Sequence, residues 1–187
     1  MIDYFALLGI ERRPFISDES LKKAYLQKTE SSRSDAGNVE ALSSFNTAFR
    51  TLSNPATRTQ HLLTLEFGDA RGGQLGSDLG GLFGTVAEAL QAVDNEFGSL
   101  SAQSSALLRA MAFQRIDAAC GKLDDADAEL SNLEQSLLAD LQRIDKAWIE
   151  NRAQCRASLA QVALNLTFVQ KWSSEVHERK IRLEELA

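Results

Sequence analysis

The stretch LDDADAELSNLEQSLLADLQRIDKAW, from Leu123 to Trp148, decides the fold class. Its apolar residues recur at steps of three and four, which places them along one face of a helix on the order of 40 Å long. The residues of this near-heptad seam are Leu123, Ala126, Leu130, Leu133, Leu137, Leu141, Ile144 and Trp148. Because the rest of the helix is polar, the seam needs an apolar partner. Antiparallel packing into a bundle is the simplest expectation, and a coiled-coil dimer formed by self-association is the alternative.

The remainder of the chain also favours helices. It contains only two prolines, and it shows none of the sustained alternation of apolar and polar residues that a half-buried strand requires. We expect one helix to begin after Gly98 and to stop at Gly121. A last helix repeats the seam at Leu159, Val162, Leu166, Val169, Trp172, Val176 and Leu183. The sequence therefore predicts an all-α fold.

Capping signals mark the helices of the amino-terminal third. Asp3 is expected to cap a short first helix, which Gly9 ends in a left-handed turn. Ser17 or Asp18 caps a second helix, and Asn54, followed by a proline in the first turn, caps a later one. The expected core residues of this region are Tyr4, Leu8, Leu21, Tyr25, Phe45 and Phe49.

Glycine is concentrated between the amino-terminal helices and the long amphipathic ones. Seven of the eleven glycines fall between Gly68 and Gly84, where repeated backbone freedom makes regular structure costly. No Gly-Lys-Ser/Thr follows them, so they do not form a phosphate-binding loop. We therefore expect a small helical domain over residues 1–67, a linker over 68–84 and a helical bundle over 85–187.

Composition argues against several functional classes. The formal charge of −6 gives no electrostatic basis for binding nucleic acid. No apolar run reaches the roughly 20 residues that cross a bilayer, and no signal sequence is visible, so we expect no membrane association and a cytoplasmic location. Two isolated cysteines, Cys120 and Cys155, and two isolated histidines, His61 and His177, provide no metal-ligand spacing. We expect neither a metal, a cofactor nor an enzymatic activity.

Three segments carry a resemblance to a known family. DYFALLGIERRPFISDESLKKAYLQKT, residues 3–29, and NTAFRTLSNPATRTQHLLTLEFG, residues 46–68, resemble the J-domain of DnaJ-type co-chaperones, and specifically the HscB type that serves iron–sulfur cluster assembly. LNLTFVQKWSSEVHERKIRLEEL, residues 164–186, resembles the end of the same family, whose second domain is a three-helix bundle. The resemblance implies a J-domain-like helical domain joined to a carboxy-terminal helical bundle.

The chain departs from the family at one motif. In J-domains the loop after the second helix carries His-Pro-Asp, which engages a DnaK-type ATPase chaperone and accelerates its ATP hydrolysis. Here the corresponding residues are Arg33, Ser34 and Asp35, so only the aspartate is kept. The ring that fixes φ is lost, and an always-charged side chain replaces the imidazole.

The resemblance implies two binding surfaces. The chaperone-binding candidates are Lys22, Lys23, Lys28, Arg33, Ser34 and Asp35, although solvated lysines on a helix are also ordinary. The client-binding candidates are Leu107, Leu108, Met111 and Phe113. Burial in the bundle is the favoured role for these four residues, because the glutamates that accompany the family's client face are not reproduced around them.

Two functions follow as expectations. The first is an HscB-like co-chaperone or adaptor that binds a DnaK-type heat-shock chaperone and an iron–sulfur scaffold client, with weak or no stimulation of the ATPase. The alternative is a helical module for protein–protein interaction that keeps the J-like fold without chaperone activity.

Overall fold

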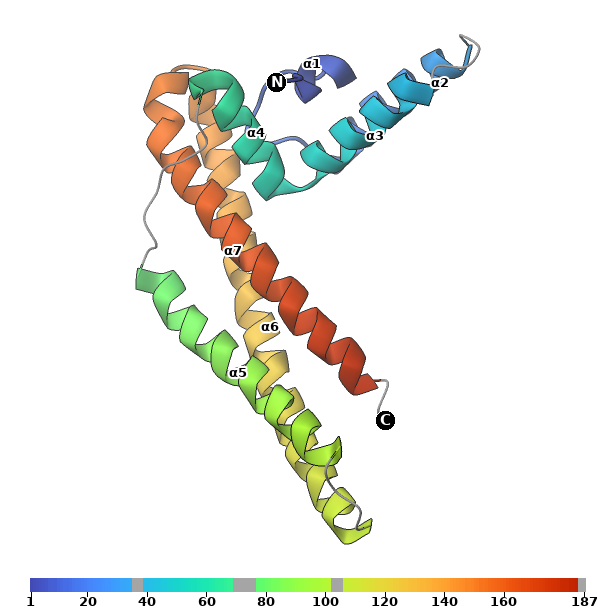
Figure 1. Cartoon of the computed structure of the whole chain (residues 1–187). Coiled ribbons are helices and arrows are strands. Elements are labelled where there is room, and N and C mark those ends of the chain that lie inside the picture. The colour runs from blue at the N-terminus through green and yellow to red at the C-terminus, as the bar shows by residue number, and fades with distance from the viewer. Residues whose placement is uncertain (35–38, 69–76, 102–105, 185–187) are drawn as a thin grey trace. The chain divides into compact units, whose positions relative to one another are not determined.

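The computed structural model describes residues 1–34, 39–68, 77–101 and 106–184, and these residues form seven α-helices and no strand (Figure 1). The all-α prediction is thereby confirmed. The helices are α1 (Tyr4–Leu8), α2 (Asp18–Ser34), α3 (Val39–Ser53), α4 (Pro55–Phe67), α5 (Ser77–Ser101), α6 (Ala106–Trp148) and α7 (Arg152–Glu184).

The predicted capping residues lie where the sequence placed them. The Asp3 carboxylate accepts hydrogen bonds from the backbone amides of Phe5 and Ala6, and Gly9 ends α1 with a φ of 69°. Ser17 precedes α2, and its hydroxyl accepts from the Ser20 amide at 3.3 Å. Asn54 caps α4 through its side chain. Short-range hydrogen bonds of this kind satisfy amides that the helix itself leaves unpaired.

The chain divides into two compact units, and helices α6 and α7 contribute to both. The first unit comprises residues 1–74 and 137–167, and the second comprises 75–136 and 168–187. This division differs from the expected boundaries, because residues 137–167 were expected to belong to a bundle that starts at residue 85. We refer to residues 137–167 as the α6–α7 hairpin.

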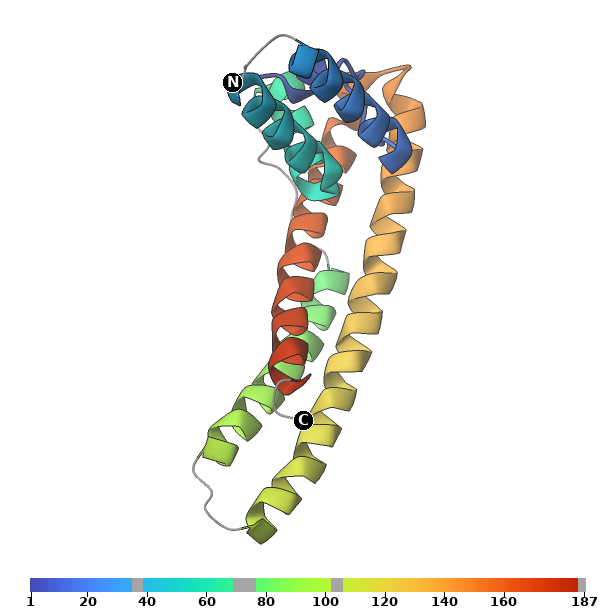
Figure 2. The same cartoon turned by 90° about the vertical axis from the view of Figure 1, so that its right-hand side faces the viewer.

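Helices α1 to α4 form one layer of the first unit. Helices α2 and α3 run antiparallel and side by side, and α1 and α4 both contact α3 (Figures 1 and 2). Among the expected core residues, Leu8 and Leu21 are buried. Four others are only half-buried, namely Tyr4, Tyr25, Phe45 and Phe49. Phe5 is fully buried instead of its neighbour Tyr4, because the first helix turns that face inward.

The α6–α7 hairpin completes the core of the first unit. Trp148, which is 1% exposed, meets the ring of Phe67 from α4 edge-on, with 6.1 Å between ring centroids. Leu141 and Leu159 are fully buried on the same hairpin. Aromatic pairs in this geometry are stabilising beyond the area they bury. Helices α1–α4 therefore pack onto the hairpin through apolar contacts.

In the second unit, α5 packs with the first part of α6 and the last part of α7. Arg179 of α7 pairs with Asp94 of α5, and Lys180 of α7 pairs with Asp127 of α6 at 2.7 Å. Arg182 lies over the ring of Phe97, 4.4 Å from its centroid. These contacts join the three helices along their polar edges, while Leu123, Ala126, Leu130, Val169, Trp172 and Val176 fill the interior.

Two glycine-based expectations were wrong. Helix α5 begins at Ser77, inside the expected linker, because Leu79, Leu82 and Val86 are buried and their burial outweighs the helix cost of the glycines between them. Helix α6 likewise continues through Gly121 without a break. A single exposed glycine costs only about 1 kcal/mol, which a long packed helix tolerates.

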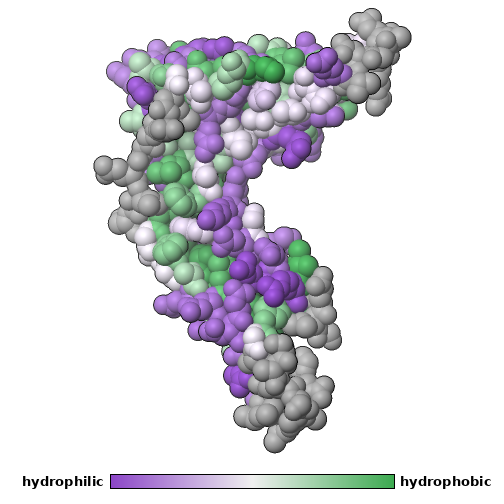
Figure 3. Space-filling view, in the orientation of Figure 1, coloured by the Kyte–Doolittle hydropathy of each residue, from purple (hydrophilic) through white to green (hydrophobic). Residues whose placement is uncertain are grey.

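The outer surface of α5 is partly apolar. Figure 3 shows hydrophobic surface over the first half of α5, where Phe83 is 58% exposed. The remaining face of Phe83 lies against Trp172, with 5.7 Å between ring centroids. Within the described ranges no helix combines the length and apolar character needed to cross a membrane.

Candidate functional site

The predicted lysines of α2 do not form a single cluster. Lys22 and Lys23 are exposed, and helical spacing places Leu26, which is 54% exposed, beside both of them. Lys28 is half-buried, and its side chain extends to Gly9, the residue that ends α1. A β-carbon at Gly9 would lie 3.5 Å from the Lys28 Cε. The structure therefore brings together Lys22 and Lys23, and separates Lys28 from them.

The other predicted binding residues are only partly described. Arg33 and Ser34 form the end of α2, but their side chains and the whole of Asp35 lie outside the described residues. The client-binding candidates belong to α6, and their side chains also lie outside the description: Leu107, Leu108, Met111 and Phe113. Both calls stay predictions.

A buried ion pair joins the segment before α2 to the α6–α7 hairpin. Arg13 donates two hydrogen bonds to the carboxylate of Asp145, one of them from Nε at 2.9 Å. The Phe15 amide donates to the same carboxylate at 3.2 Å. Asp145 is only 8% exposed, so its charge depends on these donors for compensation. We call this group the Asp145 cluster.

A second polar network is centred on Arg12, the residue next to Arg13. Arg12 donates to Asp3 at 2.6 Å and to Glu66 at 3.0 Å, and Glu66 also accepts from Arg152 at 3.1 Å. Burial alone would raise the pKa of Asp3, but hydrogen bonds from Arg12 and from the helix amides hold that pKa below its usual value. Trp148 donates from its indole nitrogen to the Arg12 carbonyl oxygen at 3.0 Å. The network ties α1, α4 and the hairpin together.

His61 is a buried histidine with a structural role. Its Nε2 accepts a hydrogen bond from the Tyr4 amide at 3.2 Å, and its ring stacks against Tyr4 and Phe5. An acceptor nitrogen carries no proton, so the ring is neutral here. Burial lowers the pKa of His61, and the nearby Asp3 carboxylate only partly offsets that effect. The residue therefore holds the start of α1 and offers no ligand position to a metal.

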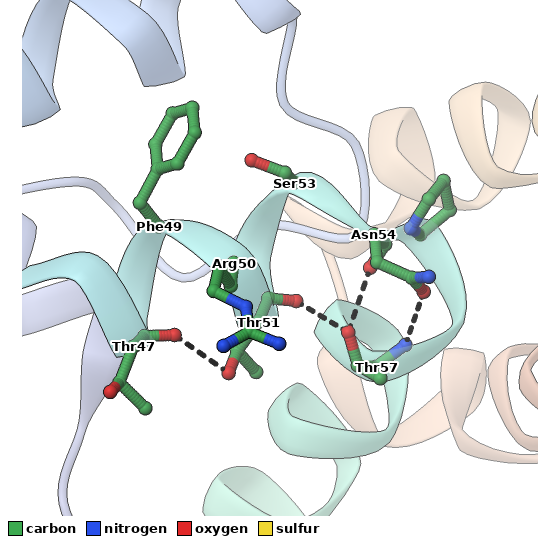
Figure 4. A pocket seen from close by; sticks show the side chains of 8 residues that line it. Thr47, Phe49, Arg50, Thr51, Ser53, Asn54 and Thr57 are labelled. Carbon is green, nitrogen blue, oxygen red and sulfur yellow. Dashed lines mark hydrogen bonds between the residues drawn. The ribbon is translucent and has the colours of Figure 1, made fainter.

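The corner between α3 and α4 is fixed by side chains from α4. Thr57 donates from its hydroxyl to the carbonyl oxygens of Thr51 at 2.7 Å and Asn54 at 3.2 Å (Figure 4). Arg58, which is 2% exposed, donates to the carbonyl oxygens of Leu52 at 2.8 Å and Pro14 at 3.1 Å. Burial lowers the pKa of Arg58 to about 10. The bonds to Thr51 and Leu52 satisfy two of the last carbonyl groups of α3, and together the four bonds make the corner stiff.

A shallow hollow opens on the outside of this corner (Figure 4). We call it the corner hollow, and its lining residues are Thr47, Phe49, Arg50, Thr51, Ser53, Asn54, Pro55 and Thr57. Arg50 is exposed, and it is the one charged side chain among the lining residues that the structure describes. Sequence reasoning missed the hollow. The Asn54 and Pro55 cap was visible in the sequence, but no local pattern relates Arg50 to the next helix.

A metal centre finds no support in the described part of the chain. No group of three or more His, Cys, Asp or Glu residues lies within ligating distance there. Cys155 is buried and Cys120 is half-buried, and burial raises the pKa of both thiols. Neutral thiols are poor nucleophiles and poor metal ligands.

Comparison with known proteins gives no assignment. No protein-family model matches the chain, and a search of curated proteins finds no match.

Proposed function

We propose that the chain is an HscB-like helical adaptor that binds a DnaK-type heat-shock chaperone through α2 and an iron–sulfur scaffold client through its other helices. The resemblance of residues 3–29, 46–68 and 164–186 to that family motivates the proposal. The observation that carries it is the arrangement of a short α1, an antiparallel α2–α3 pair and a fourth helix, with Lys22 and Lys23 exposed on α2. This order of helices agrees with what a J-like domain requires.

Binding and ATPase stimulation are uncoupled in this proposal. Exposed lysines attract an acidic partner surface through electrostatics that do not depend on the loop. Stimulation by a J-domain relies on the His-Pro-Asp loop, of which this sequence keeps only Asp35. We therefore expect weak binding with little or no stimulation.

The test measures both properties with a DnaK-type chaperone. Reversing two charges by Lys22→Glu with Lys23→Glu should weaken binding by about tenfold or more, because attraction becomes repulsion. The matched control, Lys122→Glu with Lys146→Glu, makes the same change in net charge at two exposed positions of α6 and should bind as the parent does. Equal weakening in both variants would show a non-specific charge effect and count against the proposal.

The loop is tested separately. Arg33→His with Ser34→Pro restores the imidazole and the fixed φ, so ATPase stimulation should rise while binding stays near the parent value. Strong stimulation by the parent that persists in Asp35→Ala would overturn the uncoupled model. A parent chain that binds no DnaK-type chaperone would favour the alternative, a helical interaction module.

The alternative function also has a structural observation in its favour. Helices α1–α4 are fastened to the α6–α7 hairpin by the Asp145 cluster and by Trp148. Such a fastened unit suits a protein that presents fixed helical surfaces to a partner. Binding of an iron–sulfur scaffold protein, measured by calorimetry, would separate the adaptor from the module.

A further inference from the structure

The corner hollow has the donor and acceptor pattern of a small polar binding site. The hydroxyl protons of Thr47, Thr51 and Thr57 are already used, because each side chain donates to a backbone carbonyl oxygen. These hydroxyl groups therefore offer only their lone pairs to a ligand. The amide oxygen of Asn54 accepts from the Thr57 amide, which leaves the Asn54 NH₂ group as a donor. Donors at the opening thus come from Arg50 and Asn54. The Ser53 hydroxyl, whose oxygen is buried and has no hydrogen-bond partner in the described part of the chain, is a further uncommitted donor of the lining.

Arg50 is placed to receive an external partner. It forms no hydrogen bond or ion pair with any residue that the structure describes, and none of the described lining residues carries a carboxylate. Figure 4 shows Arg50 among the side chains that line the hollow, with no dashed line from its guanidinium group to any of them. Because the whole chain carries a charge of −6, an anion is attracted here by this one side chain and not by the protein as a whole.

The corner is preformed, which lowers the cost of binding. The Thr57 and Arg58 hydrogen bonds hold the end of α3 against the start of α4 before any ligand arrives. A rigid frame loses little conformational freedom on binding. Phe49 and Pro55 also line the hollow, so the methylene groups of a ligand side chain find apolar contacts as well.

We propose that the corner hollow binds a carboxylate group of a peptide segment from a partner protein, with Arg50 as the bidentate donor. The planar guanidinium fork matches the two oxygens of a carboxylate. A phosphate group fits less well, because its additional oxygens would face the hydroxyl groups of Thr47, Thr51 and Thr57, whose protons are already donated to backbone carbonyl oxygens. The site lies on α3 and α4, so it goes beyond the α2 surface of the proposed function and stands or falls independently of it.

The experiment titrates tetrapeptides into the isotope-labelled full chain and follows two-dimensional NMR signals. The probes are Ac-Ala-Phe-Glu-Ala-amide, its Gln counterpart with the same amide end, and the Gln peptide with a free carboxyl end. The two carboxylate peptides should shift the side-chain signal of Arg50 and the amide signal of Asn54, and the neutral peptide should not. Whichever carboxylate peptide binds more tightly identifies side-chain or chain-end carboxylate as the source.

Variants complete the test. Arg50→Gln should abolish the shifts at Asn54, and Arg50→Lys should weaken binding by about tenfold because the charge stays and the fork is lost. Arg143→Gln, a change at another exposed arginine, should leave binding as it is. Circular dichroism verifies that each variant keeps the parent helix content. Equal shifts with the neutral peptide, undiminished binding in Arg50→Gln, or tighter binding of inorganic phosphate at the same ionic strength would overturn the proposal.

Discussion

The Asp145 cluster provides a direct test of how the first unit is held together. In Asp145→Ala the three hydrogen bonds from Arg13 and Phe15 are lost at a residue that is 8% exposed. Hydrogen bonds to a charged group contribute about 1.5–3 kcal/mol each, but the three do not add, because they share one carboxylate. The Arg13 side chain is 27% exposed and recovers part of its hydration. We expect the free energy of unfolding to fall by about 2–4 kcal/mol.

Two comparison variants sharpen this prediction. Asp145→Asn keeps the shape and one carbonyl oxygen but removes the charge, so it should cost less, about 1–2 kcal/mol. Asp140→Ala removes a carboxylate of the same helix that pairs with Arg143, whose side chain is 77% exposed, and should cost below about 0.5 kcal/mol.

Tryptophan fluorescence reports on the correct unit if one tryptophan is removed. Trp148 lies in the first unit and Trp172 in the second, so urea unfolding in a Trp172→Phe background follows the first unit alone. If Asp145→Ala unfolds within about 0.5 kcal/mol of its parent, like Asp140→Ala, the reasoning about this cluster is wrong.

Two other perturbations follow from burial. Leu137 is 4% exposed, so Leu137→Ala should lower the free energy of unfolding in chemical denaturation by about 2–5 kcal/mol. Leu133 is half-buried, so Leu133→Ala should lower it by clearly less. Weakened self-association with unchanged monomer stability would instead support the coiled-coil alternative. The pKa of His61 in the folded chain lies below its ordinary value of 6.5, so its contribution to thermal stability should be complete above about pH 6.5 and decline as the pH falls toward that lower pKa. The pKa of Asp3 is also lowered by folding, so a second decline should follow below about pH 3.8 as Asp3 is protonated. His61→Gln should flatten the first decline in melting temperature, and an unchanged slope would contradict the role given to this ring.

Local signals predicted the parts of the fold that depend on neighbouring residues. Asp3, Gly9 and Asn54 act within a few positions of themselves, so their capping roles could be assigned from the sequence. The seam between Leu123 and Trp148 was also visible, because helix period and apolar spacing coincide there. Six of its eight residues are buried, with Leu133 and Ile144 half-buried.

Long-range partnerships could not be predicted in the same way. Arg13 and Asp145 are 132 positions apart, and nothing near either residue marks it as half of a buried pair. The start of α5 was predicted wrongly. The sequence shows that glycines destabilise a helix, but it does not show that Leu79 and Leu82 are buried against distant parts of the chain. Arg50 was missed for a similar reason, because the corner hollow is formed jointly by the end of α3 and the start of α4.

The assembly of the first unit from two distant stretches of chain has a consequence for its synthesis. Residues 1–74 leave the ribosome well before residues 137–167 exist, and at about 5–20 residues per second the interval to Thr167 is on the order of 5–20 s. During that interval Phe67 has no Trp148 to cover it and Arg13 has no Asp145 to pair with. The apolar faces of helices α1–α4 that pack on the α6–α7 hairpin therefore stay exposed until that hairpin has been synthesised. Contacts of such large sequence separation also slow refolding. Nascent chains stalled before Leu137 should therefore be more susceptible to protease than chains released after Thr167.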